Sequence, residues 1–481
     1  MKRIAIHWLP IVIVSFLFPA TVSVGQSNPT PTPTPNANQP DLLPPALRTE
    51  IDQAVQAMLA KSGAPSSSIA VVKEGRLVYA KAYGLAELKR QRPATTAMRY
   101  SIGSISKQFT AAAILILAEG GKLSLDDPLS RWFPQLTRAG EVTVRQILSM
   151  TSGYQDFWPQ DYVMPTMMKL ESPEAILKSW AEKPLDFEPG TKWQYSNTNY
   201  VIAALIVERI TSLSLMGFLQ QHVFGPLEMK SVFDTDAGPL PAGDPERYLR
   251  YGLGPVRPAP KEGKGWMFGA GELAMTASDL AKWDISMINQ AVLKPASYFE
   301  MEKAELLKNG ASTQYGLGVS VSLVNDRRLI SHSGEVSGFT ASNAVYPDER
   351  AAVVVLTNLD ATRASVNLAN EIATMLFTPV ESEGPLAEAR AILAGLQKGK
   401  IDRSRFTSNA NAYFSEQALK DLATSLAPLG DPTKFTEVSE GLRGGMTFHR
   451  YRAQFATQNL TVSTYAMPDG KLEQFIVAPE N

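Results

Sequence analysis

A serine and a lysine three residues apart open a long apolar helix in the N-terminal third of the chain. The segment Ser104-Ile105-Ser106-Lys107 leads into apolar residues at helical spacing up to Glu119, and Gly120-Gly121 ends the run. Three residues make just under one helical turn, so Ser104 and Lys107 share a face. A buried lysine with a lowered pKa can take the proton of a serine hydroxyl, and a helix N-terminus stabilises an oxyanion. The spacing indicates a nucleophile and its base, although Ser104 alone would also fit a helix N-cap.

Two further motifs follow along the chain. Tyr195-Ser196-Asn197 is the only Tyr-x-Asn, and His332-Ser333-Gly334 follows the strand-like run 328–331. Lys61-Ser62-Gly63 also fits a [Lys/His]-x-Gly pattern, but it precedes Ser104 and is rejected for that reason. Taken singly, these motifs would fit an aromatic packing cluster, a turn asparagine and a structural histidine.

In this order, the three motifs resemble those of the serine β-lactamase and penicillin-binding-protein superfamily. The tyrosine and the His-x-Gly are similar to its branch of class C-like β-lactamases, D-specific peptidases and related esterases. The resemblance covers about residues 45–378 and includes the segment 147–153, where Met150 replaces the usual histidine. It implies an α/β (α+β) fold of the β-lactamase/transpeptidase type, in which helices flank an antiparallel sheet and an all-helical subdomain is added. Within that fold, residues 69–79 are expected to form a hairpin around Glu74-Gly75.

The resemblance also implies a role for each site residue. Ser104 attacks a carbonyl, and Lys107 and Tyr195 share the proton transfers; which of the two is the acylation base stays open. Lys107 is expected to lower the pKa of the Tyr195 phenol. The oxyanion hole is assigned to the backbone N–H groups of Ser104 and Glu335. Substrate binding and orientation are assigned to Asn197, His332, Ser333 and Gly334.

His332 is the main sequence clue to the substrate. A lysine is usual at this place in class C β-lactamases, whereas a histidine is charged only part of the time near neutral pH. The resemblance therefore favours a hydrolase of D-amino-acid peptides or small esters, with a class C-like β-lactamase as the alternative. An alternative of another class is a slow-deacylating penicillin-binding protein or a structural envelope protein. The expected partner is a small-molecule or peptide substrate.

The N-terminal segment predicts export. Two positive charges precede an apolar stretch that ends at small residues, so residues 1–25 are interpreted as a signal peptide. An uncleaved anchor is the less favoured alternative, and no cysteine follows for a lipid anchor. Residues 26–44 form a Pro/Thr-rich linker, interpreted as a spacer or as an unselected tail. A secreted, periplasmic or extracellular protein without an integral membrane segment after cleavage is expected.

Charge and composition narrow the other classes of partner. The net charge of −1 gives no electrostatic reason to expect nucleic acid. The chain has no cysteine and four histidines widely separated in sequence, so neither a metal nor another cofactor is expected.

The sequence pattern changes around residues 379–385, where a domain boundary is placed. Residues 383–481 are expected to form a small C-terminal α+β module that resembles cystatin-like or NTF2-like folds. We expect it to serve as a packing or substrate-gating appendage, because it shows no catalytic constellation. Its expected helices are 386–398 and 415–425, and its expected strands are 447–455, 460–466 and 472–477.

Overall fold

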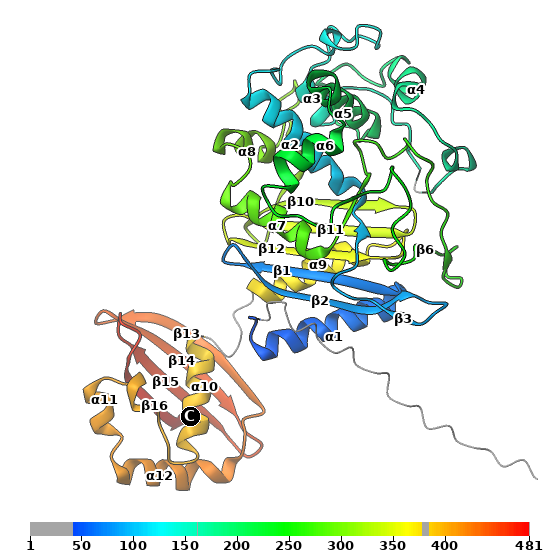
Figure 1. The fold of residues 1–481 in the computed structure, drawn as a ribbon. Helices are drawn as coiled ribbons and strands as arrows, with labels where there is room; N and C mark the ends of the chain where they lie inside the picture. The colour runs from blue at the N-terminus through cyan, green and yellow to red at the C-terminus, as the bar shows by residue number, and fades with distance from the viewer. Residues whose placement is uncertain (1–41, 161, 378–383, 481) are drawn as a thin grey trace, which may run out of the picture. The chain divides into compact units, whose positions relative to one another are not determined.

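The computed structural model describes residues 42–160, 162–377 and 384–480 (Figure 1). The predicted signal peptide, most of the predicted linker and most of the predicted domain boundary lie outside the described residues. We call residues 42–377 the main domain and residues 384–480 the C-terminal module.

A seven-stranded antiparallel sheet forms the centre of the main domain, with the strand order β3-β2-β1-β12-β11-β10-β9. The predicted hairpin is confirmed: Glu74 and Gly75 join β1 to β2 with φ of 55° and 71°, the left-handed pair that a tight hairpin turn requires. The strands are β1 Ser66–Lys73, β2 Arg76–Glu87, β3 Arg92–Pro93, β9 Ser320–Val324, β10 Arg327–Val336, β11 Phe339–Tyr346 and β12 Ala351–Thr357.

Helices cover both faces of this sheet, as Figure 1 shows. Helices α1 (Pro45–Ser62) and α9 (Ala364–Phe377) pack on one face against Val71 and Val355. The neighbouring residues Val72 and Val354 belong to the core on the other face. Because side chains alternate along a strand, the almost completely buried strands β1 and β12 supply both cores at once.

The second core includes the helical subdomain. Its elements are α2 Ser106–Glu119, α3 Val144–Leu148, α4 Pro173–Ile176, α5 Asn197–Thr211, α6 Leu215–Leu219, α7 Ala277–Asn289 and α8 Pro295–Glu302. Short strands β4 (Tyr100–Ser101), β8 (Leu273–Met275) and β5 (Phe233–Asp234) pair beside it, and β6 (Tyr248–Leu249) pairs with β7 (Arg257–Pro258). The predicted α/β (α+β) class is confirmed.

Helix α2 is buried on nearly all sides, although it carries polar residues in its first turns. Gln108 Nε2 donates to Asn343 Oδ1 of β11 (3.0 Å), and Trp283 Nε1 of α7 donates to Gln108 Oε1 (2.7 Å). Buried polar groups are tolerated when they are hydrogen-bonded in this way. These contacts fix the position of α2 against both the sheet and α7, and so the position of the residues just before it.

Among the described residues, no single helix is both long and apolar enough to cross a membrane. The bent pair formed by α5 and residues 215–224 satisfies the length and composition criteria together.

The C-terminal module contains three helices and a four-stranded antiparallel sheet of order β13-β14-β15-β16 around its own apolar core. The two predicted helices and all three predicted strands are present. Strand β13 was not predicted, because it is mostly exposed and rich in charged and small polar residues. The elements are α10 Pro385–Leu396, α11 Ser408–Tyr413, α12 Glu416–Leu426, β13 Lys434–Arg443, β14 Met446–Gln454, β15 Asn459–Ala466 and β16 Leu472–Pro479.

Candidate active site

Ser104 lies in a single 3-10 turn, Gly103–Ile105, that runs directly into α2. Strand β10 passes so close to this turn that glycine is required on both sides. A Cβ on Gly334 would lie 1.8 Å from the Ile102 carbonyl oxygen, and one on Gly103 would lie 2.6 Å from the Glu335 nitrogen. The third sequence motif is thereby brought against the first.

Lys107 is fully buried, and its amine faces three acceptors. Its Nζ lies 2.9 Å from Ser104 Oγ, 2.8 Å from Asn197 Oδ1 and 2.8 Å from the Ala270 carbonyl oxygen. A neutral amine has two hydrogens, which the amide and carbonyl oxygens can accept, so its lone pair is left for the serine hydroxyl. Burial lowers the pKa of Lys107 to about 7, against an opposing effect of Asp156. The lysine can therefore lose its proton near neutral pH.

Asp156 was missed by the sequence analysis. Its Oδ1 accepts from the backbone nitrogen of Asn197 (2.9 Å) and from the Asn197 Nδ2 (3.2 Å), at the first residue of α5. Because the amide nitrogen is held there, the amide oxygen is turned toward Lys107. No motif connects Asp156 to this pair, and only the approach of the loop after Gly153 to the start of α5 reveals it.

Tyr195 lies beside the lysine, with its ring centroid 5.0 Å from Lys107 Nζ. Burial raises the pKa of the Tyr195 phenol above its usual value, and the effect of the Ser104 hydroxyl in the other direction is smaller. The expectation of a lowered pKa is therefore wrong, because burial of the phenol has the largest effect.

His332 lies within strand β10, not after it as the sequence suggested. Its Nδ1 is 2.5 Å from the Ser333 carbonyl oxygen, and its Nε2 is 3.0 Å from the Tyr315 hydroxyl. A carbonyl only accepts, so Nδ1 carries the proton and Nε2 accepts from Tyr315. Burial, followed by the nearby Lys107, lowers the pKa of His332 to about 4. The imidazole is neutral at neutral pH, and both of its nitrogens are engaged.

The two backbone nitrogens assigned to an oxyanion hole lie in the region where β10 meets the nucleophile turn. A Cβ added to Gly334 would lie 3.2 Å from the Ser104 nitrogen, and Glu335 is the next residue along β10. This arrangement is compatible with two N–H donors on one oxygen. Their role remains a prediction.

A cavity of about 530 Å³ opens onto Ser104. Besides the predicted residues Tyr195, Asn197, His332, Ser333 and Glu335, its wall includes Trp158, Gln160, Tyr162, Gln194, Met267, Val336, Asp156 and Asp360. Trp266 does not line it; its Nε1 donates to the Lys169 carbonyl oxygen at 2.8 Å. The motif Lys61-Ser62-Gly63, rejected because of its place in the sequence, lies at the end of α1, where Gly63 caps the helix in a left-handed conformation.

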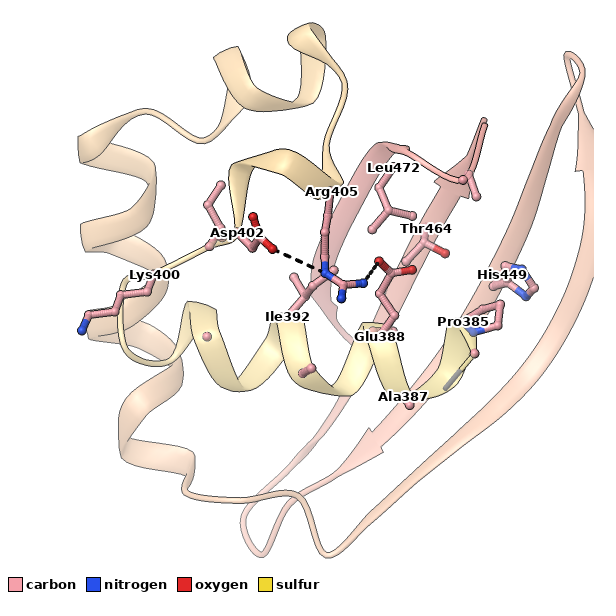
Figure 2. A pocket seen from close by; sticks show the side chains of 17 residues that line it. Pro385, Ala387, Glu388, Ile392, Lys400, Asp402, Arg405, His449, Thr464 and Leu472 are labelled. Carbon is pink, nitrogen blue, oxygen red and sulfur yellow. Dashed lines mark hydrogen bonds and ion pairs between the residues drawn. The ribbon is translucent and has the colours of Figure 1, made fainter. Parts of the chain in front are cut away.

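The C-terminal module holds a second cavity, of about 620 Å³, between α10 and the sheet. Figure 2 shows that Arg405 forms ion pairs with Glu388 on α10 (2.8 Å) and with Asp402 (3.7 Å). Ile392 and Leu472 are among the apolar residues that line the cavity. Its described lining residues include no serine, so this cavity has no counterpart of the Ser104–Lys107 pair. A cluster of Glu437, Glu440 and His449 lies nearby on β13 and β14, and His449 Nδ1 is 2.6 Å from Glu437 Oε1.

Comparison with known proteins places the main domain in one family. The family model described as Beta-lactamase matches residues 51–374. Penicillin-binding protein 4* of Bacillus subtilis is 28% identical over 313 residues, covering 61% of this chain and 68% of the relative. Protein flp of Staphylococcus aureus is 28% identical over 324 residues, and the chain spans only 63% of its length.

Solved structures of the same fold extend the comparison. A D-stereospecific amidohydrolase from Streptomyces sp. matches with a TM-score of 0.60 at 22% identity, covering 69% of this chain and 99% of that one. The octameric penicillin-binding protein homologue from Pyrococcus abyssi matches with a TM-score of 0.61 at 20% identity, covering 90% and 98%. With the motifs in place and the family model matched over most of the main domain, the chain belongs to the Beta-lactamase family, within the serine β-lactamase and penicillin-binding-protein superfamily.

Proposed function

We propose that this protein is a serine hydrolase that cleaves amide or ester bonds through an acyl-enzyme on Ser104. One observation carries the proposal: Lys107 Nζ lies 2.9 Å from Ser104 Oγ, and the pKa of this buried amine is about 7. A nucleophile with a base in hydrogen-bond reach, itself oriented by fixed groups, is the arrangement that covalent catalysis requires.

The directions in which the pKa values of Lys107 and Tyr195 are shifted indicate how the protons are transferred. Lys107 is the acylation base, because it can be neutral near pH 7, whereas the Tyr195 phenol keeps its proton. As Ser104 Oγ bonds to the carbonyl carbon, its proton passes to Lys107 and the oxyanion is held by the Ser104 and Glu335 N–H groups. The leaving group takes a proton from Lys107 or through Tyr195, and water then hydrolyses the acyl-enzyme.

We propose D-amino-acid peptides or amides, or small esters, as substrates, ahead of β-lactams. A β-lactam carries a carboxylate, and the neutral His332 offers it no positive charge. One of the structurally similar proteins is a D-stereospecific amidohydrolase, which supports amide chemistry on this fold. From the predicted signal peptide, we also propose that this activity lies outside the cytoplasm.

The test is turnover of D-alanine p-nitroanilide, p-nitrophenyl acetate and a chromogenic cephalosporin by the wild type and by Ser104→Ala. We expect turnover of the first two, and a loss of about a thousandfold or more in kcat in the variant with unchanged circular dichroism. Retained turnover above a few per cent would refute Ser104 as nucleophile.

Two other outcomes would favour the competing functions. Efficient cephalosporin hydrolysis would identify a β-lactamase. A stable penicilloyl adduct without turnover would identify a slow-deacylating binder, a role that the relative named penicillin-binding protein 4* keeps open.

A further inference from the structure

The cavity at Ser104 has an uneven charge. Three carboxylates line it, from Asp156, Glu335 and Asp360, and no lysine or arginine is found among its described lining residues. Lys107 lies beneath it, fully buried, with its amine directed to three protein oxygens. His332, the remaining basic side chain of the wall, is engaged at both nitrogens. The charged groups that a substrate meets in this cavity are therefore acidic.

Two of these carboxylates are held in place by backbone N–H groups. Glu335 Oε1 accepts from the Ala361 nitrogen at 2.7 Å, and Asp360 Oδ2 accepts from the Gly338 nitrogen at 3.0 Å. The Ala361 contact brings the Glu335 carboxylate next to the residue that follows Asp360. An ionised carboxylate can accept about four hydrogen bonds, so a backbone donor does not exhaust its acceptor capacity.

The position of Glu335 relates this acidic wall to the reacting bond. Its backbone nitrogen is one of the two expected oxyanion donors, and Glu335 is among the residues that line the same cavity. A group a few bonds from the reacting carbonyl is thus within reach of its carboxylate. Arg363 lines a separate hollow of about 250 Å³ that shares Glu335 but not Asp360 or Asp156.

We propose that the substrate carries a positively charged amine close to the scissile carbonyl, as in an amino acid amide or ester with a free α-amino group, and that Glu335 and Asp360 bind this amine. The inference rests on the proposed hydrolase function. An ammonium group donates three hydrogen bonds and matches carboxylates that are already oriented. A carboxylate at the same place would meet like charges, so anionic substrates are disfavoured.

Three p-nitrophenyl esters with the same leaving group provide the test: those of D-alanine, N-acetyl-D-alanine and N-succinyl-D-alanine. Their charges near the carbonyl are positive, neutral and negative. We expect kcat/KM to fall in that order, with the free amine preferred over the acetylated form on the order of tenfold or more. Equal or better turnover of the acetylated or succinylated ester would overturn the inference.

Variants assign the preference to the two carboxylates. Glu335→Gln and Asp360→Asn keep an acceptor for the Ala361 and Gly338 N–H groups but remove the charge. Each is expected to reduce the preference for the free amine at least threefold, measured as the ratio of kcat/KM for the free-amine ester to kcat/KM for the acetylated ester in the same variant. Glu371→Gln removes the same charge from the exposed side of α9, away from the cavity lining, and should leave the preference unchanged. An unchanged preference in both cavity variants would refute the assignment.

Labelling by a small neutral fluorophosphonate separates this inference from the proposed function. If Ser104→Ala loses labelling but the acetylated or succinylated ester is turned over as well as the free-amine ester, the inference is refuted and the proposed function stands. Labelled Ser104 without turnover of any of the three esters also counts against it. No labelling of the wild type at all would remove the proposed function itself.

Discussion

At the scale of single residues, the chemistry depends on how Lys107 shares its contacts. The amide of Asn197 and the carbonyl of Ala270 occupy two of its hydrogens, and burial makes the neutral form accessible. Asp156 acts twice, by orienting the amide and by its negative charge, which opposes the lowering of the lysine pKa. Both the protonation state of Lys107 and the orientation of its amine are therefore set by neighbouring groups.

The rate of acylation should therefore rise with pH through about 7. A base must be deprotonated to act, so activity on the acidic side is lost as pH falls through the lysine pKa of about 7. Asp156→Asn removes the charge that raises this pKa, and the acidic limb should move to lower pH, on the order of one unit. The pH profile of kcat/KM for a neutral ester checks this, with Glu371→Gln as the charge control. A limb that stays in place or moves upward in Asp156→Asn would contradict the account.

His332 should stay neutral well below neutral pH. Its pKa in the folded protein is about 4, against 6.5 for an unperturbed histidine. The unfolded chain takes up the proton first, so the stability contributed by this residue is lost as pH falls from 6.5 toward 4. Histidine ring NMR, with the His332 signals identified by their loss in His332→Gln, should show no titration above pH 5. A midpoint near 6.5 would contradict the buried, doubly bonded ring.

At the scale of elements, the site depends on how closely β10 approaches the turn before α2. Gly334 is needed because a Cβ there would overlap the backbone oxygen of Ile102, which no side-chain movement can relieve. The Glu335 nitrogen would then be displaced from Ser104.

Gly334→Ala is expected to lower kcat for any ester by about a hundredfold or more, the scale of losing one oxyanion donor. It should also lower the melting temperature. Gly140→Ala is the matched control, because nothing lies within 4 Å of a Cβ at that position. Wild-type kcat in Gly334→Ala would show that the close approach is not required.

The sequence predicted these elements unevenly. The helix after Ser104, the hairpin at Glu74-Gly75 and the order of the motifs could be predicted, because turn chemistry and apolar spacing are local. Asp156, Ala270 and Tyr315 could not be assigned their contacts, because each reaches the site through contacts distant in sequence. The Tyr195 pKa was predicted in the wrong direction, because a sequence gives neighbours but not the extent of burial.

At the scale of the whole molecule, the main domain contains every residue of the candidate site. The module has its own apolar core, formed by residues such as Leu393, Phe414 and Tyr451. A chain ending at residue 377 should therefore keep kcat/KM for a neutral ester within about threefold of the full-length value. Steady-state kinetics on the two purified chains measure this. A loss of tenfold or more, with the truncated chain folded by circular dichroism, would show that the module takes part in catalysis.

The most direct test of the central claim is the intact mass of the protein after reaction with a small neutral fluorophosphonate. The account predicts a single adduct on the wild type, none on Ser104→Ala, and much slower labelling of Lys107→Ala, because that variant lacks the base. An adduct on Ser104→Ala, or labelling of Lys107→Ala at the wild-type rate, would contradict the assignment of Ser104 as nucleophile and Lys107 as its base.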